Sequence, residues 1–325
     1  MGMKNVCIAG YGAVAPVHAD AIAKTSSAKL YAVCDINPEK NDICRSKYDV
    51  VTYTDFDEML KDKNIDSVHI CTPHYLHFEM IEKAIKSGKN VLCEKPVVIT
   101  KSEFDRLLSL EGNDKLNVVL QNRLNPCMLC LRKIAESGKM GKINGVKGIV
   151  AWQRTAEYYL KDNWRGKWKS EGGGVLINQA IHTLDYLCLI AGEARSVKAS
   201  MCNLSLPEIE VEDTITARIN FQNGVKGLFF ASNSSSANSS VDFEVFFENG
   251  EAHYIDNKLY INGKLVEEDI TPLHEKSYWG IGHEKLIKNY YDNEIGFSVE
   301  TVKNTMDATF AIYESAKNNG MEIII

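Results

Sequence analysis

Hydrophobic residues in the first part of the chain fall into short runs, and the segments between them have the spacing of amphipathic helices. The runs are rich in β-branched residues and typical of buried strands, at 5–9, 30–34, 67–71, 90–93 and 117–120. Helical periodicity fills the intervals, near 13–24, 38–48, 56–61, 77–86 and 101–110. Because parallel strands need helical crossovers, this alternation predicts an α/β fold with a doubly wound parallel sheet over residues 1–123.

The pattern changes after Arg123. Helices are predicted near 128–136 and 175–191, with a strand over 146–153 between them. Four more strand-like runs follow, with turn signals such as Asn223-Gly224 between them, at 197–202, 214–221, 227–232 and 243–247. Two helical patterns close the chain, at 283–291 and 299–317. Strands joined by hairpins predict an antiparallel sheet within an α+β domain over residues 124–325.

Composition excludes several classes of function. The 325 residues carry a formal net charge of -6, and no long basic run could follow a phosphate backbone, so we expect no nucleic-acid partner. No signal-peptide pattern precedes the first strand, and no run approaches the roughly 18 apolar residues that span a bilayer. We therefore expect a cytoplasmic protein without a membrane partner. The nine cysteines predict neither a disulfide framework nor a metal site, because Cys127 and Cys130 lack a second ligand pair.

The turn after the first strand has the features of a dinucleotide-binding loop. Gly10 permits a tight turn, and Gly12 lets a pyrophosphate approach the backbone of the turn that continues through Ala13 and Val14. Asp35 ends the second strand, where a carboxylate accepts ribose hydroxyls and repels a 2′-phosphate. These residues predict NAD in preference to NADP. The alternative is a glycine-rich turn in another kind of doubly wound protein.

A lysine follows the buried strand 90–93, in the sequence Glu94-Lys95-Pro96. This position is the carboxyl end of a parallel strand, where open α/β sheets bind their ligands. Beside a positively charged nicotinamide, burial and like charge would lower the pKa of Lys95, which could then exchange a proton with a hydroxyl. The alternative is an ordinary surface lysine.

A second group of polar residues lies on the apolar helix that follows Gly172–Gly174. Asn178, His182 and Asp185 are spaced to share one stripe of a regular helix. Polar side chains are costly to bury without a role, so we predict that His182 exchanges a proton with a substrate hydroxyl. The alternative is a structural histidine whose hydrogen bonds are satisfied.

An aromatic and cationic loop precedes these glycines. Tyr158 and Trp164 could stack on the CH faces of a sugar, and Arg165 could bind a carboxylate, a phosphate or the cofactor amide. The alternative is that the aromatic side chains pack an interface between domains. Gln121, at the end of the fifth strand, is a further candidate for cofactor binding.

Taken together, these motifs resemble the Gfo/Idh/MocA family, which includes glucose-fructose oxidoreductase and inositol dehydrogenase. The resemblance covers nearly the whole chain and is carried by Gly10, Gly12, His18, Thr72-Pro73, His77, Glu94-Lys95-Pro96, Gly172–Gly174, His182, Asp185 and Gly282-His283. It implies a Rossmann domain, then a domain with an open antiparallel sheet that often mediates dimers or tetramers. It also implies that the lysine takes part in a proton relay. The candidate cofactor-binding residues then include Thr72, Pro73, His77, Glu94 and Lys95.

The chain departs from the commonest pattern of this family at Asn178, where an aspartate is usual. An amide cannot act as a base, so proton removal is predicted to fall on Lys95 and His182. Asn178 would then orient the substrate by hydrogen bonds.

These observations predict an NAD-dependent oxidoreductase that acts on a CH–OH group. The predicted substrate is a small molecule such as a sugar, glycoside, cyclitol or sugar acid, and the predicted assembly is a homodimer or homotetramer without a metal. In one alternative, tightly held NAD oxidises the substrate transiently during glycoside cleavage or epimerisation. In the other, the protein is a non-catalytic sensor of NAD or sugar, an interpretation supported only by Asn178.

Overall fold

The computed structural model describes residues 2–270, 279–293 and 295–325. These residues form two compact units. Among the described residues, unit 1 comprises 2–121, 282–293 and 295–302, and unit 2 comprises 122–270, 279–281 and 303–325. The sequence pattern placed the first boundary after residue 123, but it gave no sign that a later segment returns to unit 1.

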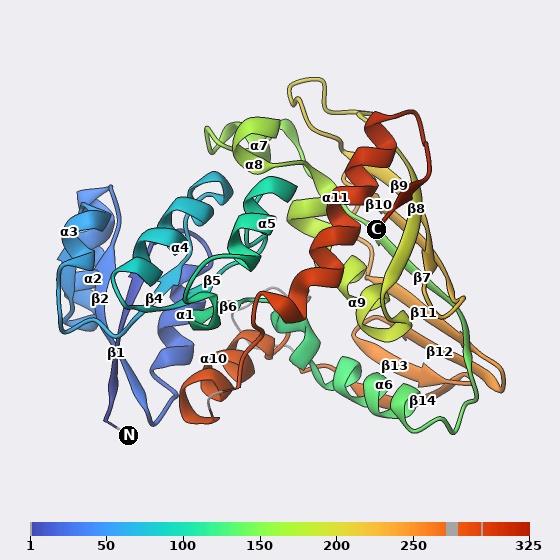
Figure 1. Ribbon diagram of the computed structural model, residues 1–325, viewed down its shortest axis with the longest axis horizontal. Helices are drawn as coiled ribbons and strands as arrows, with labels where there is room; N and C mark the ends of the chain where they lie inside the picture. Colours follow the sequence, from blue (N-terminus) through green and yellow to red (C-terminus); the bar gives the residue numbers. More distant parts are fainter. Residues whose placement is uncertain (1, 271–278, 294) are drawn as a thin grey trace. The chain divides into compact units, whose positions relative to one another are not determined.

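Unit 1 contains a six-stranded sheet in which all neighbouring strands are parallel (Figure 1). Its order is β3-β2-β1-β4-β5-β6, and the strands are β1 Lys4–Ala9, β2 Ala28–Cys34, β3 Val51–Tyr53, β4 Ser67–Ile70, β5 Asn90–Cys93 and β6 Leu116–Val118. The predicted doubly wound parallel sheet is confirmed. Strand β3 was not predicted because its three residues are too few to show a period and none of them is fully buried.

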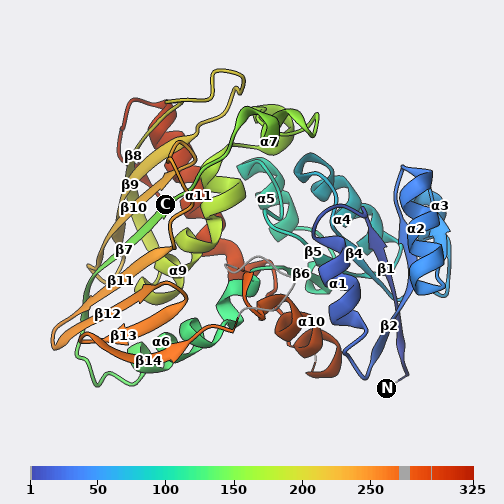
Figure 2. The ribbon, with the colours of Figure 1, turned by 180° about the vertical axis from the view of Figure 1, so that it is seen from behind.

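Helices cover the sheet of unit 1. They are α1 Ala15–Ile22, α2 Pro38–Tyr48, α3 Phe56–Leu60, α4 His77–Lys86, α5 Lys101–Leu108 and α10 Gly282–Asn293, with 3₁₀ turns at His74–Leu76, Asn113–Lys115 and Glu300–Val302. Side-chain hydrogen bonds cap the N-termini of α2 and α5. Asn37 accepts from the Glu39 amide at the start of α2, and Thr100 forms a capping box with Glu103 at the start of α5. Helix α10, from the returning segment, packs against α1 (Figure 2).

Unit 2 contains a nine-stranded sheet. Its order is β14-β13-β12-β11-β7-β10-β9-β8-β15, and the strands are β7 Ile143–Ala151, β8 Ala194–Cys202, β9 Thr214–Phe221, β10 Lys226–Ser232, β11 Asp242–Phe247, β12 Gly250–Ile255, β13 Lys258–Ile261, β14 Lys264–Glu268 and β15 Ile323–Ile324. Every neighbouring pair is antiparallel except β7 and β10, which run parallel. The sheet is therefore mixed and mostly antiparallel, as the α+β prediction requires.

The helices of unit 2 are α6 Pro126–Glu136, α7 Ala156–Leu160, α8 Trp168–Glu171, α9 Ile181–Ala191 and α11 Lys303–Lys317, and a 3₁₀ turn spans Gln121–Leu124. Helices α9 and α11 pack on the same face of the sheet (Figures 1 and 2). The sequence predicted one regular helix over 175–191, but the structure starts it with a π-helical turn, Leu176–Ala180. Glycines on the sheet allow close contact: a Cβ on Gly148 would lie 2.6 Å from Leu187 of α9.

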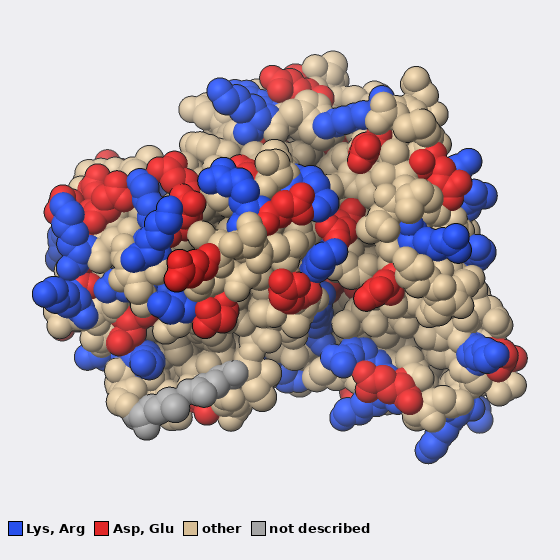
Figure 3. All heavy atoms as spheres, in the orientation of Figure 1, with Lys and Arg blue, Asp and Glu red and all other residues tan. Residues whose placement is uncertain are grey.

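By length and composition alone, the helical region Trp168–Ala191 could cross a membrane. Its most apolar window has a mean hydropathy of 1.3 but is 83% buried inside the protein. It is therefore largely buried in the core of unit 2. On the face shown in Figure 3, acidic and basic side chains are interspersed.

Candidate functional site

The glycine loop of unit 1 is shaped by close contact on one side and open space on the other. Gly10 has a φ of +84°, and a Cβ there would lie 2.8 Å from Cγ2 of Thr72 and 2.9 Å from the backbone of Cys71. A Cβ on Gly12 would meet no atom within 4 Å. The loop is thus closed against β4 at Gly10 and accessible at Gly12, which is what an approaching pyrophosphate requires.

The start of α1 adds backbone donors to this loop. Its N-cap residue, Val14, provides no side-chain hydrogen bond, and a proline occupies the first turn. The Val14 side chain therefore does not occupy the first amides of α1, and the helix dipole favours an anion at this end. These residues fit the dinucleotide for which the loop was predicted.

Asp35 connects the end of β2 to the same loop. It is buried, and its Oδ2 accepts from the Tyr11 amide at 2.7 Å while Oδ1 accepts from the Asn37 amide at 2.9 Å. Lys40 Nζ lies 3.4 Å from Oδ2. The carboxylate is thus fixed beside the glycine loop, where the sequence placed the group that binds the ribose.

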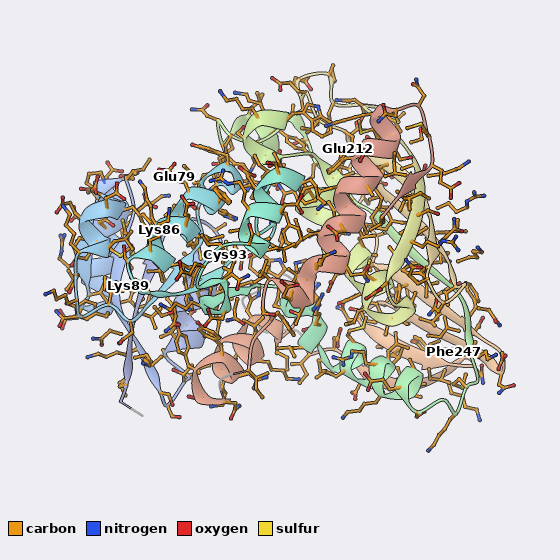
Figure 4. All side chains as sticks on the ribbon, viewed as in Figure 1. Glu79, Lys86, Lys89, Cys93, Glu212 and Phe247 are labelled. Carbon is orange, nitrogen blue, oxygen red and sulfur yellow. The ribbon has the colours of Figure 1, made fainter. Side chains whose placement is uncertain are left out.

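Lys95 follows β5, which ends at Cys93 (labelled in Figure 4), and is half-buried; the Lys95–Pro96 peptide bond is cis. His77 lies behind this turn and is fully buried, with Nδ1 2.7 Å from the Pro96 carbonyl oxygen and Nε2 2.9 Å from that of Thr72. Burial lowers the pKa of His77, so the ring is neutral at neutral pH and donates to one carbonyl at a time. His77 therefore acts by joining two loops at the sheet edge.

A buried network of histidines surrounds Glu94. Glu94 Oε1 lies 2.9 Å from His18 Nε2 and 3.3 Å from His283 Nε2. His18 Nδ1 lies 2.9 Å from His69 Nδ1, and His69 Nε2 lies 2.8 Å from the Tyr291 hydroxyl. Burial alone would raise the pKa of Glu94, but hydrogen bonds from His18 and His283 outweigh it and hold the pKa well below its usual range. The residue before the candidate lysine therefore stays anionic.

The same network fixes the backbone of the candidate lysine. The Lys95 amide donates to Glu94 Oε2 at 3.2 Å. The ligand atoms of His18, Glu94 and His283 lie within 4.8 Å of one another, a spacing that could also hold a metal ion. His18 and His283 both lie directly against the Glu94 carboxylate, and the expectation that no metal takes part stays a prediction.

In unit 2, Glu212 holds the glycine turn that leads to α9. Its Oε2 accepts from the Gly174 amide at 2.9 Å, and Oε1 accepts from the Leu176 amide at 3.1 Å and from the Tyr313 hydroxyl at 2.9 Å (Glu212 is labelled in Figure 4). A Cβ on Gly174 would lie 1.9 Å from the Glu212 carbonyl oxygen, and one on Gly173 would lie 2.0 Å from the Tyr313 hydroxyl. Only glycine fits this turn.

Asn178 belongs to the π-helical turn and His182 to the first turn of α9, and both are half-buried. The sequence placed them on one face of a regular helix. A π turn has a different number of residues per turn, so the spacing of four residues no longer guarantees a common direction. Asn178 Nδ2 donates to Glu171 Oε1 at the end of α8.

The loop before α8 brings three predicted residues together. The Arg165 guanidinium lies 4.7 Å from the centre of the Tyr158 ring and 4.5 Å from that of Trp164. It also donates to the Tyr158 hydroxyl at 2.6 Å and to Asp162 at 2.9 Å. The hydroxyl of Tyr158 accepts a further bond, at 3.1 Å, from Gln179 in the π turn. The loop and the π turn are therefore connected by side chains.

Asp185 has a structural role, although the sequence placed it on the stripe of Asn178 and His182. It is 1% exposed and accepts two bonds from Arg123, at 2.6 and 2.8 Å. A third bond comes from Thr305 at 2.6 Å. This ion pair holds the start of unit 2 against α9 and α11.

Unit 2 also contains a hollow of about 150 Å³, lined in part by Asn122, Trp152, Thr183, Tyr186 and Ser239. Asn122 follows Gln121, which is 2% exposed at the start of its 3₁₀ turn. Thr183 follows His182 in α9. The hollow is thus adjacent in sequence to two of the predicted site residues.

Sequence reasoning missed Glu171 and Glu212, which hold the candidate residues of unit 2 in place. Glu171 directly precedes the three glycines, and its position in that motif was the one available signal. Glu212 is distant in sequence from the turn it holds, and no local pattern reveals it. The candidate residues fall into two groups, one on each unit.

Two family models match the chain. Residues 4–121 match the oxidoreductase family model with an NAD-binding Rossmann fold, and residues 128–253 match the GFO/IDH/MocA C-terminal domain. The chain belongs to the Gfo/Idh/MocA family.

Individual relatives are distant but span much of the chain. An uncharacterized oxidoreductase of Schizosaccharomyces pombe, C115.03, is 34% identical over 52% of this chain and 46% of its own length. Myo-inositol 2-dehydrogenase of Thermotoga maritima is 26% identical over 81% of this chain and 78% of its own. The alignments span 46% and 61% of the first two curated relatives, so their whole activities cannot be carried over directly.

Solved structures match over the whole chain. The WlbA dehydrogenase from Bordetella pertussis, in complex with NADH and UDP-GlcNAcA, has a TM-score of 0.86 and 26% identity, and 99% of each chain is covered. This chain of the Gfo/Idh/MocA family thus belongs to a family of oxidoreductases with an NAD-binding Rossmann domain, and the relatives that it resembles include a myo-inositol 2-dehydrogenase and the WlbA dehydrogenase. The predictions of family, enzyme class and NAD are confirmed.

Proposed function

We propose that the protein oxidises a secondary hydroxyl of a sugar, glycoside, cyclitol or sugar acid, and that Lys95 and His182 exchange the hydroxyl proton. The observation that carries the proposal is the Lys95 turn at the end of β5, on the same sheet edge as the glycine loop and Asp35. Bound NAD supplies the hydride acceptor. Lys95, as the neutral amine, takes the proton that the hydroxyl loses.

The environment of Lys95 supports this role. Glu94 and His77 fix the backbone on both sides of the lysine, so its side chain starts from a rigid point. Orientation is a large part of such catalysis, because proton and hydride must leave adjacent atoms of one carbinol group. In unit 2, Asn178 and His182 are carried by a turn held by buried hydrogen bonds, which supports their proposed contact with the substrate.

Two arginines favour an acidic sugar within the proposed substrate class. The guanidinium of Arg165 lies 4.7 Å and that of Arg154 lies 5.4 Å from the centre of the Tyr158 ring. Guanidinium groups bind carboxylate and phosphate oxygens well. The solved WlbA complex contains UDP-GlcNAcA, and other relatives are named for levoglucosan and myo-inositol. Compounds of all three kinds are therefore suitable trial substrates.

The test is the Lys95→Ala variant, assayed with a panel of sugars, sugar acids, glycosides and cyclitols by NADH absorbance. We expect NADH formation to fall by at least about a thousandfold because the base is lost, while NADH binding, measured by fluorescence titration, stays within about threefold. Lys86→Ala, on the exposed side of α4, is the matched control and should behave as wild type. Unchanged turnover in Lys95→Ala would exclude the proposed base.

The same assay separates the two alternatives. Product formation without added NAD and without net NADH would indicate transient oxidation by retained cofactor. Binding of NADH and sugar without any product would indicate a sensor.

We also propose that the protein is cytoplasmic and forms a homodimer or homotetramer through the sheet face opposite α9 and α11. This face exposes Leu228 and Phe246, which are 59% and 38% exposed. Basic residues lie on β8 and β9 and acidic residues on β11, including Arg218 and Glu244. A second copy related by a twofold axis could oppose these charges.

A further inference from the structure

The hollow of unit 2 is large enough to hold one ring of a ligand. It lies between α9, the end of β7 and the turn after β12, where Thr183, Trp152 and Asn257 line it. Its volume of about 150 Å³ is roughly ten times the ~15 Å³ that one buried water needs and about half of the ~300 Å³ of a small ligand-binding pocket. The space therefore suits a single ring rather than a whole substrate.

One amide oxygen that borders the hollow has no partner within the described part of the protein. Asn122 lines the hollow, and its Oδ1 is buried without a hydrogen bond from any described residue. The backbone of this residue is fixed, because its carbonyl oxygen accepts from the Asn125 amide at 3.2 Å. A buried acceptor of this kind costs free energy until a donor reaches it. A ligand hydroxyl in the hollow would supply that donor.

Thr183 presents a second polar group at the hollow. It is 3% exposed, and its methyl carbon Cγ2 faces β7, since a Cβ on Gly148 would lie 2.9 Å from it. The hydroxyl therefore points away from that contact, and it forms no hydrogen bond with the residues that the structure describes. A threonine hydroxyl both donates and accepts, so it can pair with a ligand hydroxyl in either direction.

The rest of the lining favours a neutral ligand. Of the lining residues that the structure describes, none carries a formal charge. Carboxylate and phosphate groups are bound by cationic side chains, which this described lining lacks. Trp152 and Tyr186 instead offer aromatic surfaces, and the Trp152 indole is fixed because its Nε1 donates to the Ser239 carbonyl oxygen at 3.0 Å. Aromatic rings beside amide and hydroxyl groups suit the CH faces and hydroxyls of a neutral sugar ring.

The hollow lies beside the candidate reaction site of unit 2 but does not coincide with it. Thr183 directly follows His182 in α9, so their Cα atoms are about 3.8 Å apart. Successive residues of an α-helix point about 100° apart around its axis. A ring that contacts the Thr183 hydroxyl therefore lies to one side of the group that His182 faces. Two rings joined by a glycosidic bond have this relation, because they are adjacent but separate.

We propose that the hollow is a subsite for a neutral, hydroxylated ring that is joined by a glycosidic bond to the ring being oxidised. The substrate is then a glycoside of at least two rings. Asn122 and Thr183 bind hydroxyls of the second ring, and the aromatic side chains pack on its CH groups. This inference rests on the proposed function, because it requires a sugar that is oxidised beside His182. An acidic group on the substrate would meet Arg154 and Arg165, which lie outside the described lining.

The first test compares each free sugar that wild type oxidises with neutral disaccharides of that sugar, by NADH absorbance at saturating NAD. We expect kcat/KM for the best disaccharide to exceed that for the free sugar by at least about tenfold, because the second ring adds hydrogen bonds and packing. A methyl glycoside has no second ring and should behave like the free sugar. If free sugars or cyclitols are better substrates than all disaccharides, the inference is overturned and the dehydrogenase assignment stands.

Thr183→Val tests the hollow directly. The substitution keeps a methyl group against Gly148 and removes only the hydroxyl, so we expect the melting temperature to stay within about 2 °C of wild type. For the disaccharide, KM should rise about tenfold with kcat unchanged, because the lost bond is made equally in the ground state and the transition state. KM for the free sugar should not change. Thr216→Val, at an exposed position of β9, is the matched control and should leave both KM values unchanged.

Asn122→Leu provides an independent measurement. Leucine has a similar size but no polar side-chain atom, and Oδ1 of Asn122 has no bond to lose within the described structure, so the variant should be at least as stable as wild type. Its KM for the disaccharide should also rise about tenfold.

Two results separate this inference from the proposed function. An unchanged disaccharide KM in both variants, or an equal rise for the free sugar, would show that the hollow holds solvent only and would overturn the inference alone. If wild type neither oxidises any sugar, glycoside or cyclitol nor binds one in calorimetry with NADH, the inference and the proposed function both fail.

Discussion

The pKa values of two buried glutamates are shifted in opposite directions, so the two residues affect the pH dependence of folding stability differently. Hydrogen bonds from histidines hold the pKa of Glu94 below its usual range, so Glu94 contributes stability at neutral pH that is lost as pH falls below about 4.5. Burial raises the pKa of Glu212 from 4.5 to about 7, although hydrogen bonds from Gly174, Leu176 and Tyr313 act in the opposite direction. The two carboxyl groups therefore have opposite effects on stability as pH rises.

The Glu212 shift leads to a prediction for unfolding. In the unfolded chain this carboxyl loses its proton near pH 4.5, but in the folded protein only near pH 7. As pH rises from 4.5 to about 7, the contribution of this carboxyl group to the free energy of unfolding therefore falls by on the order of 3 kcal/mol. In Glu212→Gln this contribution is absent. Urea unfolding at pH 5 and pH 8 should show that the stability advantage of wild type over the variant is larger at pH 5. An advantage independent of pH would contradict the shift.

The positions of single residues in the fold could be predicted where a short motif marks the end of a strand. Gly10, Asp35 and Lys95 each stand at the end of a strand, and the structure places them at the carboxyl edge of one parallel sheet. Glu171 and Gln179 were not predicted, because hydrogen bonds between a loop and a distant turn leave no periodic signal. The sequence assigned His77 to the cofactor site, which stays a prediction; its ring contacts join two backbone segments.

At the scale of elements, alternation of buried strands and helices predicted the sheet of unit 1 almost completely. In unit 2 the hairpin signals gave the antiparallel pairs, but not the parallel pairing of β7 with β10, which depends on how distant strands meet. Strands β12, β13 and β14 are only six, four and five residues long, which is too short for an alternating pattern to reveal them. The π turn before α9 could not be predicted from the sequence, because it changes the backbone hydrogen bonding without changing the pattern of apolar residues.

The glycine loop offers a paired test at this scale. Gly10→Ala forces a Cβ against Thr72 and Cys71 at a positive φ, so it should destabilise the protein by at least about 1 kcal/mol. Gly12→Ala meets no neighbouring atom and should keep the wild-type melting temperature, but its methyl group occupies the space of the approaching pyrophosphate. We expect NADH affinity of Gly12→Ala to fall about tenfold in a fluorescence titration. NADH affinity equal to wild type would contradict the proposed position of the pyrophosphate.

At the scale of the whole molecule, the uncovered sheet face predicts association. Wild type should elute in size-exclusion chromatography with light scattering at a multiple of 36.4 kDa. Leu228→Glu, in the centre of the face, should shift the mass toward the monomer because it buries an unpaired charge in the interface. Leu204→Glu, in an exposed loop between β8 and β9, is the control and should leave the mass unchanged. A monomeric wild type would exclude this assembly.

The return of residues 282–302 to unit 1 has a consequence for anyone who builds chimeras from this chain. The nucleotide-binding module is encoded in two pieces, and the second contributes His283 and Tyr291 to the histidine network. A fragment that stops at Gln121 would lose a partner of Glu94 and uncover α1. To exchange this module with that of a relative, the two sequences must be joined at three points: after residue 121, before residue 282 and after residue 302.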